Sequence, residues 1–531
     1  MSMTEQDSAG HISQLSAQDA QFLYIQSATN LTHLMAVYIF DPSTAPGGKV
    51  RFKDIIEHMR NRLDISPVFR RKLYRLPMDI DHPYWVKDDH FDLEAHISHG
   101  RLPAPGDWRQ FCIHLARHHS KPMDMTRPLW DMYVLEGLDN VAGFAKGSYA
   151  ILTRIHHATI DGVSGAHFFA ALSDKDAKGT PAIPLPKDRQ ADDDLPSISE
   201  ILNRAINSTV TSPVKLAQAM LKFTPALLSS AQKSLTSKEE KTESGVPQTR
   251  FNGPVTPHKM FDAITFDLDE LKKMRLKVEE ATINDVVLAI CSGGLRHYLT
   301  KHKELPKESL IAVAPVNARR RAGDENNPGN NISAMTIKIW SNIADPVKRL
   351  EAIRDTTRDT KAAKSGLGAR IMTDVTKHIP GVTMAGVAKI LTDERFAPKF
   401  SNLMVSNVPG PQIQLYMNGA KLTHQYGLAP LAHGMGLFIA TPSYNGKISF
   451  NIISDRKMMP DVEFFRECIQ RAFDELRDAK PSTAKRQTKK VAVESKKPVM
   501  SNDGSVMYRR VARKPRTVGS KVIDRGKPKV K

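Results

Sequence analysis

The sequence predicts a mixed α/β protein with two halves, on two observations. Segments rich in β-branched and aromatic residues, such as 148–155 and 261–268, alternate with segments expected to be helical, such as 269–279 and 282–298. Two polar stretches that contain proline, 173–196 and 237–257, separate the earlier segments from the later ones. Alternating strands and helices predict sheets covered by helices, so we expect an α/β fold in a chain long enough for two or three domains.

The segment from His156 to Gly162 places two histidines, an aspartate and a glycine directly after the predicted strand 148–155. Residues 162–172 then predict a helix that opens with glycine and has an apolar face. A rigid sheet can aim a histidine at a strand end into a cleft, and its ordinary pKa of ~6.5 suits proton transfer at neutral pH. This segment is therefore the candidate catalytic site, although a histidine pair by itself is more often structural.

A second group of histidines contains His114, His118 and His119. His114 and His118 have the one-turn spacing that can bind a metal, but the glutamate of a HExxH motif is missing, so we predict no metal site. The sequence also has no GxxxxGK[ST] loop and no GxGxxG turn after a strand, which argues against nucleotide chemistry.

The HHxxxDG pattern at 156–162 resembles the active-site signature of the CoA-dependent acyltransferase superfamily. Further segments narrow the resemblance to the bacterial wax ester synthase/diacylglycerol acyltransferase family. In chain order they are LSAQDAQF at 15–22, RPLW at 127–130, INDVVLA at 283–289, SNVPGP at 406–411, SYNG at 443–446 and SDR at 454–456. The resemblance covers the chain from residue 12 to about residue 475.

The resemblance implies two chloramphenicol-acetyltransferase-like halves, each a sheet with helices, and an active-site tunnel between them. We expect a first half at 1–190, a linker with an amphipathic helical insert at 191–257, a second half at 258–478 and a disordered basic tail at 479–531. The helical periodicity of the insert lies in 198–236. These helices could cover the active site, enter a bilayer interface or pack into an ordinary core.

The implied reaction moves a long-chain acyl group from coenzyme A to diacylglycerol or a long-chain alcohol, giving triacylglycerol or wax ester. By resemblance, His157 is the general base and acts in a ternary complex of both substrates. His156 would shape the turn and support its neighbour. Acyl-CoA is then a substrate, and we expect neither a cofactor nor a metal.

The resemblance also gives roles to three further residues, Asp161, Gly162 and Arg319. Asp161 would form a structural ion pair with Arg319 that ties the two halves together, instead of orienting the base. Gly162 would let the backbone approach the CoA arm, where any Cβ would intrude.

The predicted helix at 282–298 carries a candidate for the donor that stabilises the oxyanion, Asn284. An equally favoured alternative is that Thr282 and Asp285 form a capping box and Asn284 fills the first turn between them. The turn at 406–410 lies beside the tunnel in the family, but backbone shape alone could explain its composition. Residues expected to be architectural are Asp19, Pro128, Leu129 and Trp130.

Composition agrees with a large globular enzyme. The 531 residues are 40% apolar with a mean hydropathy of −0.37, and no apolar run reaches the ~20 residues of a membrane-spanning helix. The N-terminus is polar and predicts no signal peptide. Three scattered cysteines, Cys112, Cys291 and Cys468, indicate a reducing cytoplasm without a disulfide framework or a zinc site.

The net charge of +19 is concentrated in the tail. Residues 481–531 contain 16 lysines and arginines against three acidic residues, a net charge of +13, which leaves +6 for the rest of the chain. We expect this tail to bind an anionic membrane or lipid-droplet surface, which would place the enzyme at the inner membrane face or on lipid inclusions. Nucleic acid is a less favoured partner because Tyr508 is the only aromatic residue there. A tail that only increases solubility is nearly as favoured.

Two other functions stay open at this point. A condensation-type acyltransferase on a different acceptor would share HHxxxDG, although the chain has no carrier or adenylation module. A non-catalytic coat protein could bind a lipid surface through the helical insert and the basic tail. The acceptor and the preferred acyl chain length depend on tunnel side chains that the sequence does not place.

Overall fold

The computed structural model describes residues 13–76, 81–159, 169, 172–179, 245–317, 332–364 and 401–481, together with 495–500 and 506–511. The chain divides into two units, residues 1–481 and 482–531. The predicted helix at 162–172, apart from residues 169 and 172, and the helical insert at 198–236 lie outside the described residues.

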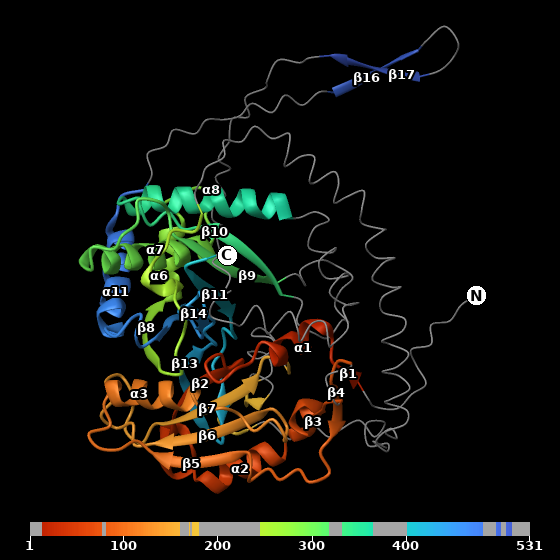
Figure 1. Cartoon of the computed structure of the whole chain (residues 1–531), viewed down its shortest axis with the longest axis vertical. Coiled ribbons are helices and arrows are strands. Elements are labelled where there is room, and N and C mark those ends of the chain that lie inside the picture. The colour runs from red at the N-terminus through yellow and green to blue at the C-terminus, as the bar shows by residue number, and fades with distance from the viewer. Residues whose placement is uncertain are drawn as a thin grey trace, which may run out of the picture. The chain divides into compact units, whose positions relative to one another are not determined.

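The first sheet has six strands and receives two of them from the second half of the sequence (Figure 1). Its order is β12 (Tyr416–Met417), β13 (Ala420–Leu428), β2 (His33–Asp41), β7 (Tyr149–His156), β6 (Trp130–Glu136) and β5 (Ile97–Arg101). The pairs are antiparallel except β5 with β6, which is parallel. Because β13 pairs with β2, main-chain hydrogen bonds join the two halves of the chain.

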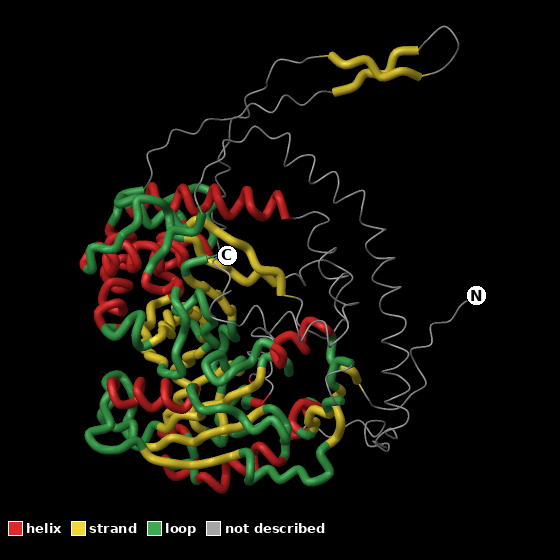
Figure 2. Tube along the Cα trace, viewed as in Figure 1, coloured by secondary structure: helices red, strands yellow, loops and turns green. Residues whose placement is uncertain are grey.

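The second sheet also has six strands. Its order is β10 (Ile332–Lys338), β9 (Ile311–Asn317), β11 (Leu403–Pro409), β14 (Leu437–Tyr444), β15 (Lys447–Asp455) and β8 (Lys259–Asp267). Strand β11 runs parallel to β9 and β14, and the other pairs are antiparallel. Four helices pack against this sheet, as Figure 2 shows: α6 (Leu268–Arg275), α7 (Ile283–Lys301), α8 (Pro346–Lys364) and α11 (Val462–Asp478).

Smaller elements complete the first half. A three-stranded antiparallel sheet has the order β1 (Ser13–Gln14), β4 (Tyr84–Lys87) and β3 (Arg71–Tyr74). The helices of this half are α1 (Ala17–Tyr24), α2 (Phe52–Arg60) and α3 (Trp108–His119). Short 3-10 helices lie at Pro42–Thr44, Pro46–Gly48, Leu63–Ile65, Pro67–Phe69 and Arg250–Asn252.

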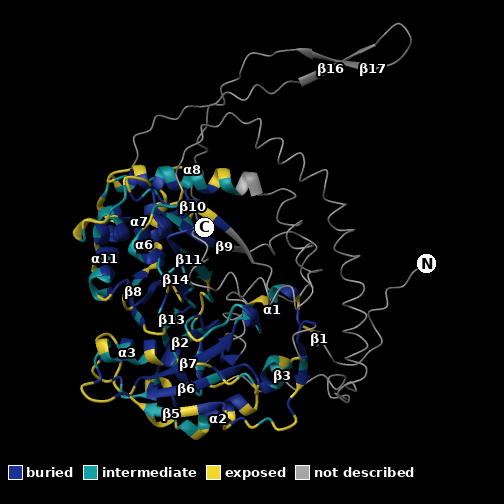
Figure 3. Ribbon diagram, viewed as in Figure 1, coloured by how far each residue is buried: buried dark blue, intermediate teal, exposed yellow. Residues whose placement is uncertain are grey.

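The alternation of side chains along β2 builds two separate cores. Met35, Val37 and Ile39 point to one face of the sheet, where α3 packs and the core continues into the second half. Tyr38 and Phe40 point to the other face, which α2 covers. Both faces of the sheet are therefore buried, and Figure 3 shows the neighbouring strand β7 as buried along its length.

Most strands and helices named from the sequence are confirmed. The strand expected at 148–155 is β7, that at 261–268 is β8, and the helix expected at 282–298 is α7. The helix expected at 269–279 ends earlier, because α6 stops at Arg275. Leu276 is 74% exposed, so no burial of its side chain favours another helical turn.

In the second unit the structure describes strands β16 (Ser495–Met500) and β17 (Val506–Val511), which pair antiparallel. The disorder predicted for residues 482–494, 501–505 and 512–531 stays a prediction, because these residues lie outside the described part. Within the described ranges, no helix combines the length and the apolar character that crossing a membrane requires. Cys112, Cys291 and Cys468 are all buried and free.

Candidate active site

Strand β7 carries the candidate site at its C-terminal end. All eight of its residues are buried, and it is paired with β2 on one side and β6 on the other. The register places His156 opposite His33, and the main-chain N–H of His157 donates to the carbonyl oxygen of Thr32 at 3.0 Å. Hydrogen bonds on both sides of the strand therefore fix where the two histidines leave the sheet.

Both ring nitrogens of His156 are occupied. The main-chain N–H of Ala158 donates to Nδ1 at 3.1 Å, so the ring proton sits on Nε2. Nε2 lies 2.8 Å from Oε1 of Gln26 and 2.9 Å from Oγ1 of Thr32. Burial, with a smaller contribution from His157, lowers the pKa of His156 to about 3. His156 is thus neutral at physiological pH and has no ring nitrogen left to accept a substrate proton.

His157 has a different environment. It is half-buried, and its ring stacks on Phe22 with 4.0 Å between centroids and 13° between the ring planes. A parallel contact of this kind restricts the orientation of the imidazole. Of the two consecutive histidines, His157 is therefore the one that is partly exposed and held in place by an aromatic face.

Helix α1 explains how Phe22 comes to lie against His157. Ser16 caps the helix, since its Oγ accepts from the N–H of Asp19 at 3.1 Å and donates to the Asp19 carboxylate at 2.6 Å. The hydroxyl of Thr32 lies 2.8 Å from the carbonyl oxygen of Phe22 and ties the end of the helix to β2. The segment at 15–22 thus contributes a capped helix that carries an aromatic residue to the site.

Three residues of this site had no role assigned from the sequence: Phe22, Gln26 and Thr32. Phe22 is the last residue of the segment at 15–22 that resembles a family motif, so its place in that motif could have identified it. Gln26 and Thr32 are outside every motif, and only the pairing of β2 with β7 brings them to His156.

Three other predicted site residues, Asp161, Gly162 and Arg319, lie outside the described residues. The Asp161–Arg319 ion pair and the approach of the backbone to the CoA arm at Gly162 therefore stay predictions. The architectural role expected for Trp130 agrees with its environment, because the indole is 2% exposed and its Nε1–H donates to the carbonyl oxygen of Phe69 at 3.1 Å.

The capping box expected at the start of α7 is confirmed. Oδ2 of Asp285 accepts from the N–H of Thr282 at 2.7 Å, and Oγ1 of Thr282 accepts from the N–H of Asp285 at 3.2 Å. The Thr357 hydroxyl of α8 donates to Oδ1 of Asp285 at 2.7 Å. Asn284 is half-buried and forms no side-chain hydrogen bond with a described residue, and no contact there joins it to His157.

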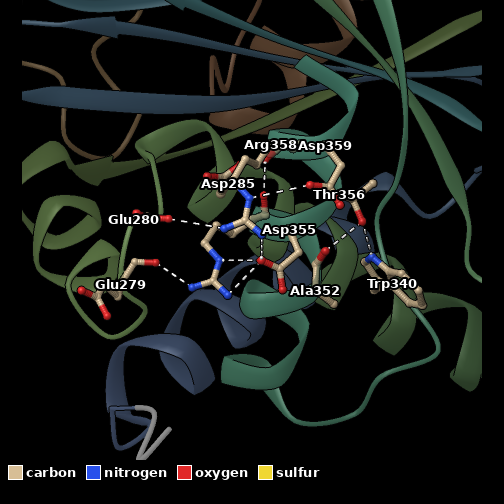
Figure 4. Close-up of polar contacts among 11 residues, drawn as sticks. Glu279, Glu280, Asp285, Trp340, Ala352, Asp355, Thr356, Arg358 and Asp359 are labelled. Atoms are coloured by element: carbon tan, nitrogen blue, oxygen red, sulfur yellow. Dashed lines mark hydrogen bonds and ion pairs between the residues drawn. The ribbon is translucent and has the colours of Figure 1, made fainter. Parts of the chain in front are cut away.

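The loop before α7 is held by α8. Figure 4 shows Arg358 reaching Glu280, at 3.4 Å, with Asp355 of the same helix 3.1 Å from the guanidinium. Together with the buried hydrogen bond from Thr357 to Asp285, these exposed contacts join α8 to the loop and to the first turn of α7, which carries Asn284.

The second group of histidines lies on α3. The rings of His114 and His118 are 6.3 Å apart, and both lie beside Tyr133. Burial lowers the pKa of His118 to about 3. Across the ranges that the structure describes, no three histidine, cysteine or acidic side chains are grouped to hold a metal ion.

The SNVPGP and SYNG segments meet in the second sheet. The N–H of Gly410, just after β11, donates to the carbonyl oxygen of Ser443 on β14 at 2.9 Å. A Cβ on Gly410 would overlap that same oxygen, which is main chain and cannot swing aside. The glycine is therefore required by the close approach of two backbones.

We expect Gly410→Ala to lower the free energy of unfolding by about 1–3 kcal/mol, the usual cost of forcing extra volume into a packed site. Thermal unfolding followed by circular dichroism measures the change. Gly427→Ala, on β13, is the matched control because a Cβ there meets open space. Equal melting temperatures for the two variants would contradict the steric explanation.

Comparison with known proteins gives a consistent result. Residues 15–287 match the family model of the wax ester synthase/diacylglycerol acyltransferase catalytic domain, and residues 328–477 match that of the C-terminal domain. A Mycobacterium tuberculosis protein named as a candidate diacylglycerol O-acyltransferase is 31% identical in an alignment that covers 84% of this chain and 87% of that protein. A second one from the same species is 30% identical in an alignment that covers 87% of this chain and 96% of that protein.

Solved structures show the same fold. The wax ester synthase/diacylglycerol acyltransferase from Marinobacter aquaeolei VT8 matches with a TM-score of 0.62 at 22% identity, covering 87% of this chain and 98% of the other. The TRI3 trichothecene 15-O-acetyltransferase from Fusarium sporotrichioides matches with a TM-score of 0.55 at 12% identity, covering 88% and 97%.

Proposed function

This chain belongs to the wax ester synthase/diacylglycerol acyltransferase family, and from that premise we propose that it transfers a long-chain acyl group from acyl-CoA to diacylglycerol, a long-chain alcohol or both. The chain is an O-acyltransferase. The observation that carries the proposed mechanism is the contrast at the end of β7: His156 is neutral with both ring nitrogens occupied, while His157 is half-buried against Phe22.

In the proposed reaction His157 is the general base. A thioester is already an activated acyl donor, so the enzyme needs no covalent nucleophile. The imidazole accepts the proton of the acceptor hydroxyl as its oxygen attacks the thioester carbonyl. The tetrahedral intermediate then collapses, the C–S bond breaks, and the same proton passes to the sulfur of coenzyme A. The products are an ester and free CoA.

Other residues complete the proposal. Asn284 donates a hydrogen bond to the oxyanion, since its side-chain amide has no other partner among the described residues. His156 holds the turn through Gln26 and Thr32. The Asp161–Arg319 pair links the halves, and Gly162 admits the CoA arm.

We also propose that the basic tail brings the enzyme to an anionic membrane or lipid-droplet surface. Its charge of +13 over residues 481–531 supports this, because each cation near such a surface contributes about 1 kcal/mol. Long-chain acceptors concentrate at the same surfaces, so the tail would raise the local substrate concentration.

The decisive assay supplies radiolabelled palmitoyl-CoA with equal amounts of diacylglycerol and hexadecanol. We expect a labelled ester, and the ratio of triacylglycerol to wax ester identifies the acceptor. Release of CoA with labelled amide instead of ester, when an amine acceptor is added, would favour a condensation-type reaction. Binding to vesicles without any acylated product would favour a coat protein.

A further inference from the structure

A basic groove lies between the two halves of the chain. Its floor and walls come from α3 on one side and from the start of β8 and the end of β15 on the other, and its volume is about 430 Å³. The charged residues that line it are Arg109, Arg117, Lys259, Arg456 and Glu463. Positive side chains thus outnumber the single carboxylate.

Lys259 is the buried cation of this groove. It is 7% exposed, and its Nζ has no hydrogen-bond partner in the described part of the chain. The adjacent carboxylate of Asp455 is already occupied, by the N–H and hydroxyl of Thr256 and the N–H of Lys457. Burial lowers the pKa of Lys259 to about 8. An ammonium whose N–H groups are buried without an acceptor is costly, so an anion that entered the groove would supply the missing acceptor.

The rim of the groove is also cationic. Arg117 and Arg456 are exposed, and neither forms an ion pair with a described residue. Among the described residues that line the groove, the one carboxylate is that of Glu463, which lies 4.0 Å from Arg109.

The floor of the groove lies where α3 packs against β8. The positive charge of Lys259 helps to lower the pKa values of His33 and His119. His33 and His119 bond to each other's carbonyl oxygens, at 2.8 and 3.1 Å. His33 in turn lies opposite His156 in the sheet.

We propose that this groove binds the phosphate-bearing nucleotide end of acyl-CoA, with Lys259 donating to a phosphate oxygen at the floor and Arg117 and Arg456 closing around the remaining phosphates. The inference rests on the proposed function, which makes acyl-CoA the donor. Charge-assisted hydrogen bonds to phosphate are short and strong, and lysine and arginine are the residues that form them. The pantetheine arm would then extend from the groove toward His157.

The test compares palmitoyl-CoA with S-palmitoyl-pantetheine, a donor without phosphates. In Lys259→Met the preference for palmitoyl-CoA, measured as the ratio of the two kcat/KM values, is expected to fall about 10- to 100-fold. Methionine fits the same space and removes a desolvated charge, so the variant should fold with an unchanged or higher Tm. Arg117→Ser at the exposed rim is a second variant, with a smaller fall expected. Lys447→Met is the matched control, because that lysine is exposed and pairs with Asp267.

Calorimetric titration with CoA alone separates the two proposals. Lys259-dependent CoA binding without ester formation would leave the groove assignment standing and overturn the proposed function. Ester formation with an unchanged donor preference in both variants would overturn the groove assignment alone. A lipid headgroup is the other source of phosphate. If Lys259→Met weakened binding to phosphatidylglycerol vesicles but not to CoA, the groove would be a headgroup site and the proposal would be wrong.

Discussion

His157→Ala is expected to reduce kcat for ester formation about 10²- to 10⁴-fold, the usual contribution of a general base. The loss follows because an alcohol is a far weaker nucleophile than its alkoxide, and the neighbouring His156 has no ring nitrogen free to replace the base. Initial rates with saturating palmitoyl-CoA and acceptor measure the effect. The fold should persist, because the lost stacking on Phe22 is worth only about 0.5–1.5 kcal/mol.

His90→Ala is the matched control for this experiment, since His90 is an exposed histidine of the same half. It should keep the activity of the unmodified enzyme. Turnover within a few-fold of normal in His157→Ala, with the same melting temperature, would show that another group removes the proton.

Arg154→Met is expected to give the largest loss of stability, about 3 kcal/mol, the lower end of the range for breaking a buried ion pair. Arg154 is 6% exposed on β7. Its guanidinium bonds both carboxylate oxygens of Asp131, at 2.9 and 2.6 Å, and the carbonyl oxygens of His118 and Lys121, at 3.1 and 2.6 Å. Methionine keeps the packing but leaves these acceptors without their donor. Chemical denaturation measures the change in the free energy of unfolding.

Arg101→Met serves as the control, because Arg101 is exposed and its nearest carboxylates, Glu136 and Asp139, are both 4.0 Å away. Exposed pairs of this kind contribute about 0–1 kcal/mol. If both variants lost the same stability, the role of Arg154 in anchoring α3 to β7 would be refuted. Activity should fall along with stability, since β7 positions His157.

The sequence predicted local structure well where a few adjacent residues decide it. Thr282 and Asp285 are three residues apart, and that spacing alone specifies the capping box at the start of α7. The composition of 148–155 was sufficient to predict the strand before the histidines. The helix at 269–279 was predicted too long because periodicity does not show that Leu276 faces solvent.

The candidate site was only partly predictable. The histidine motif was found from its own residues and from the resemblance, but the assignment of different roles to His156 and His157 rested on the resemblance alone. The physical reason for the difference lies in Gln26, Thr32 and Phe22, which are more than 120 residues away in the chain. No local pattern encodes contacts across such a separation.

The amino-acid sequence by itself thus determined several strands and helices, the family and the position of the histidine motif, because strand alternation, capping and motif spacing depend on residues that are neighbours in the chain. Only the tertiary structure decided that His156 is neutral, that Phe22 covers His157, that β13 joins the first sheet and that Lys259 is buried in a basic groove. Those properties arise from burial and from strand register, which are set when distant segments pack together.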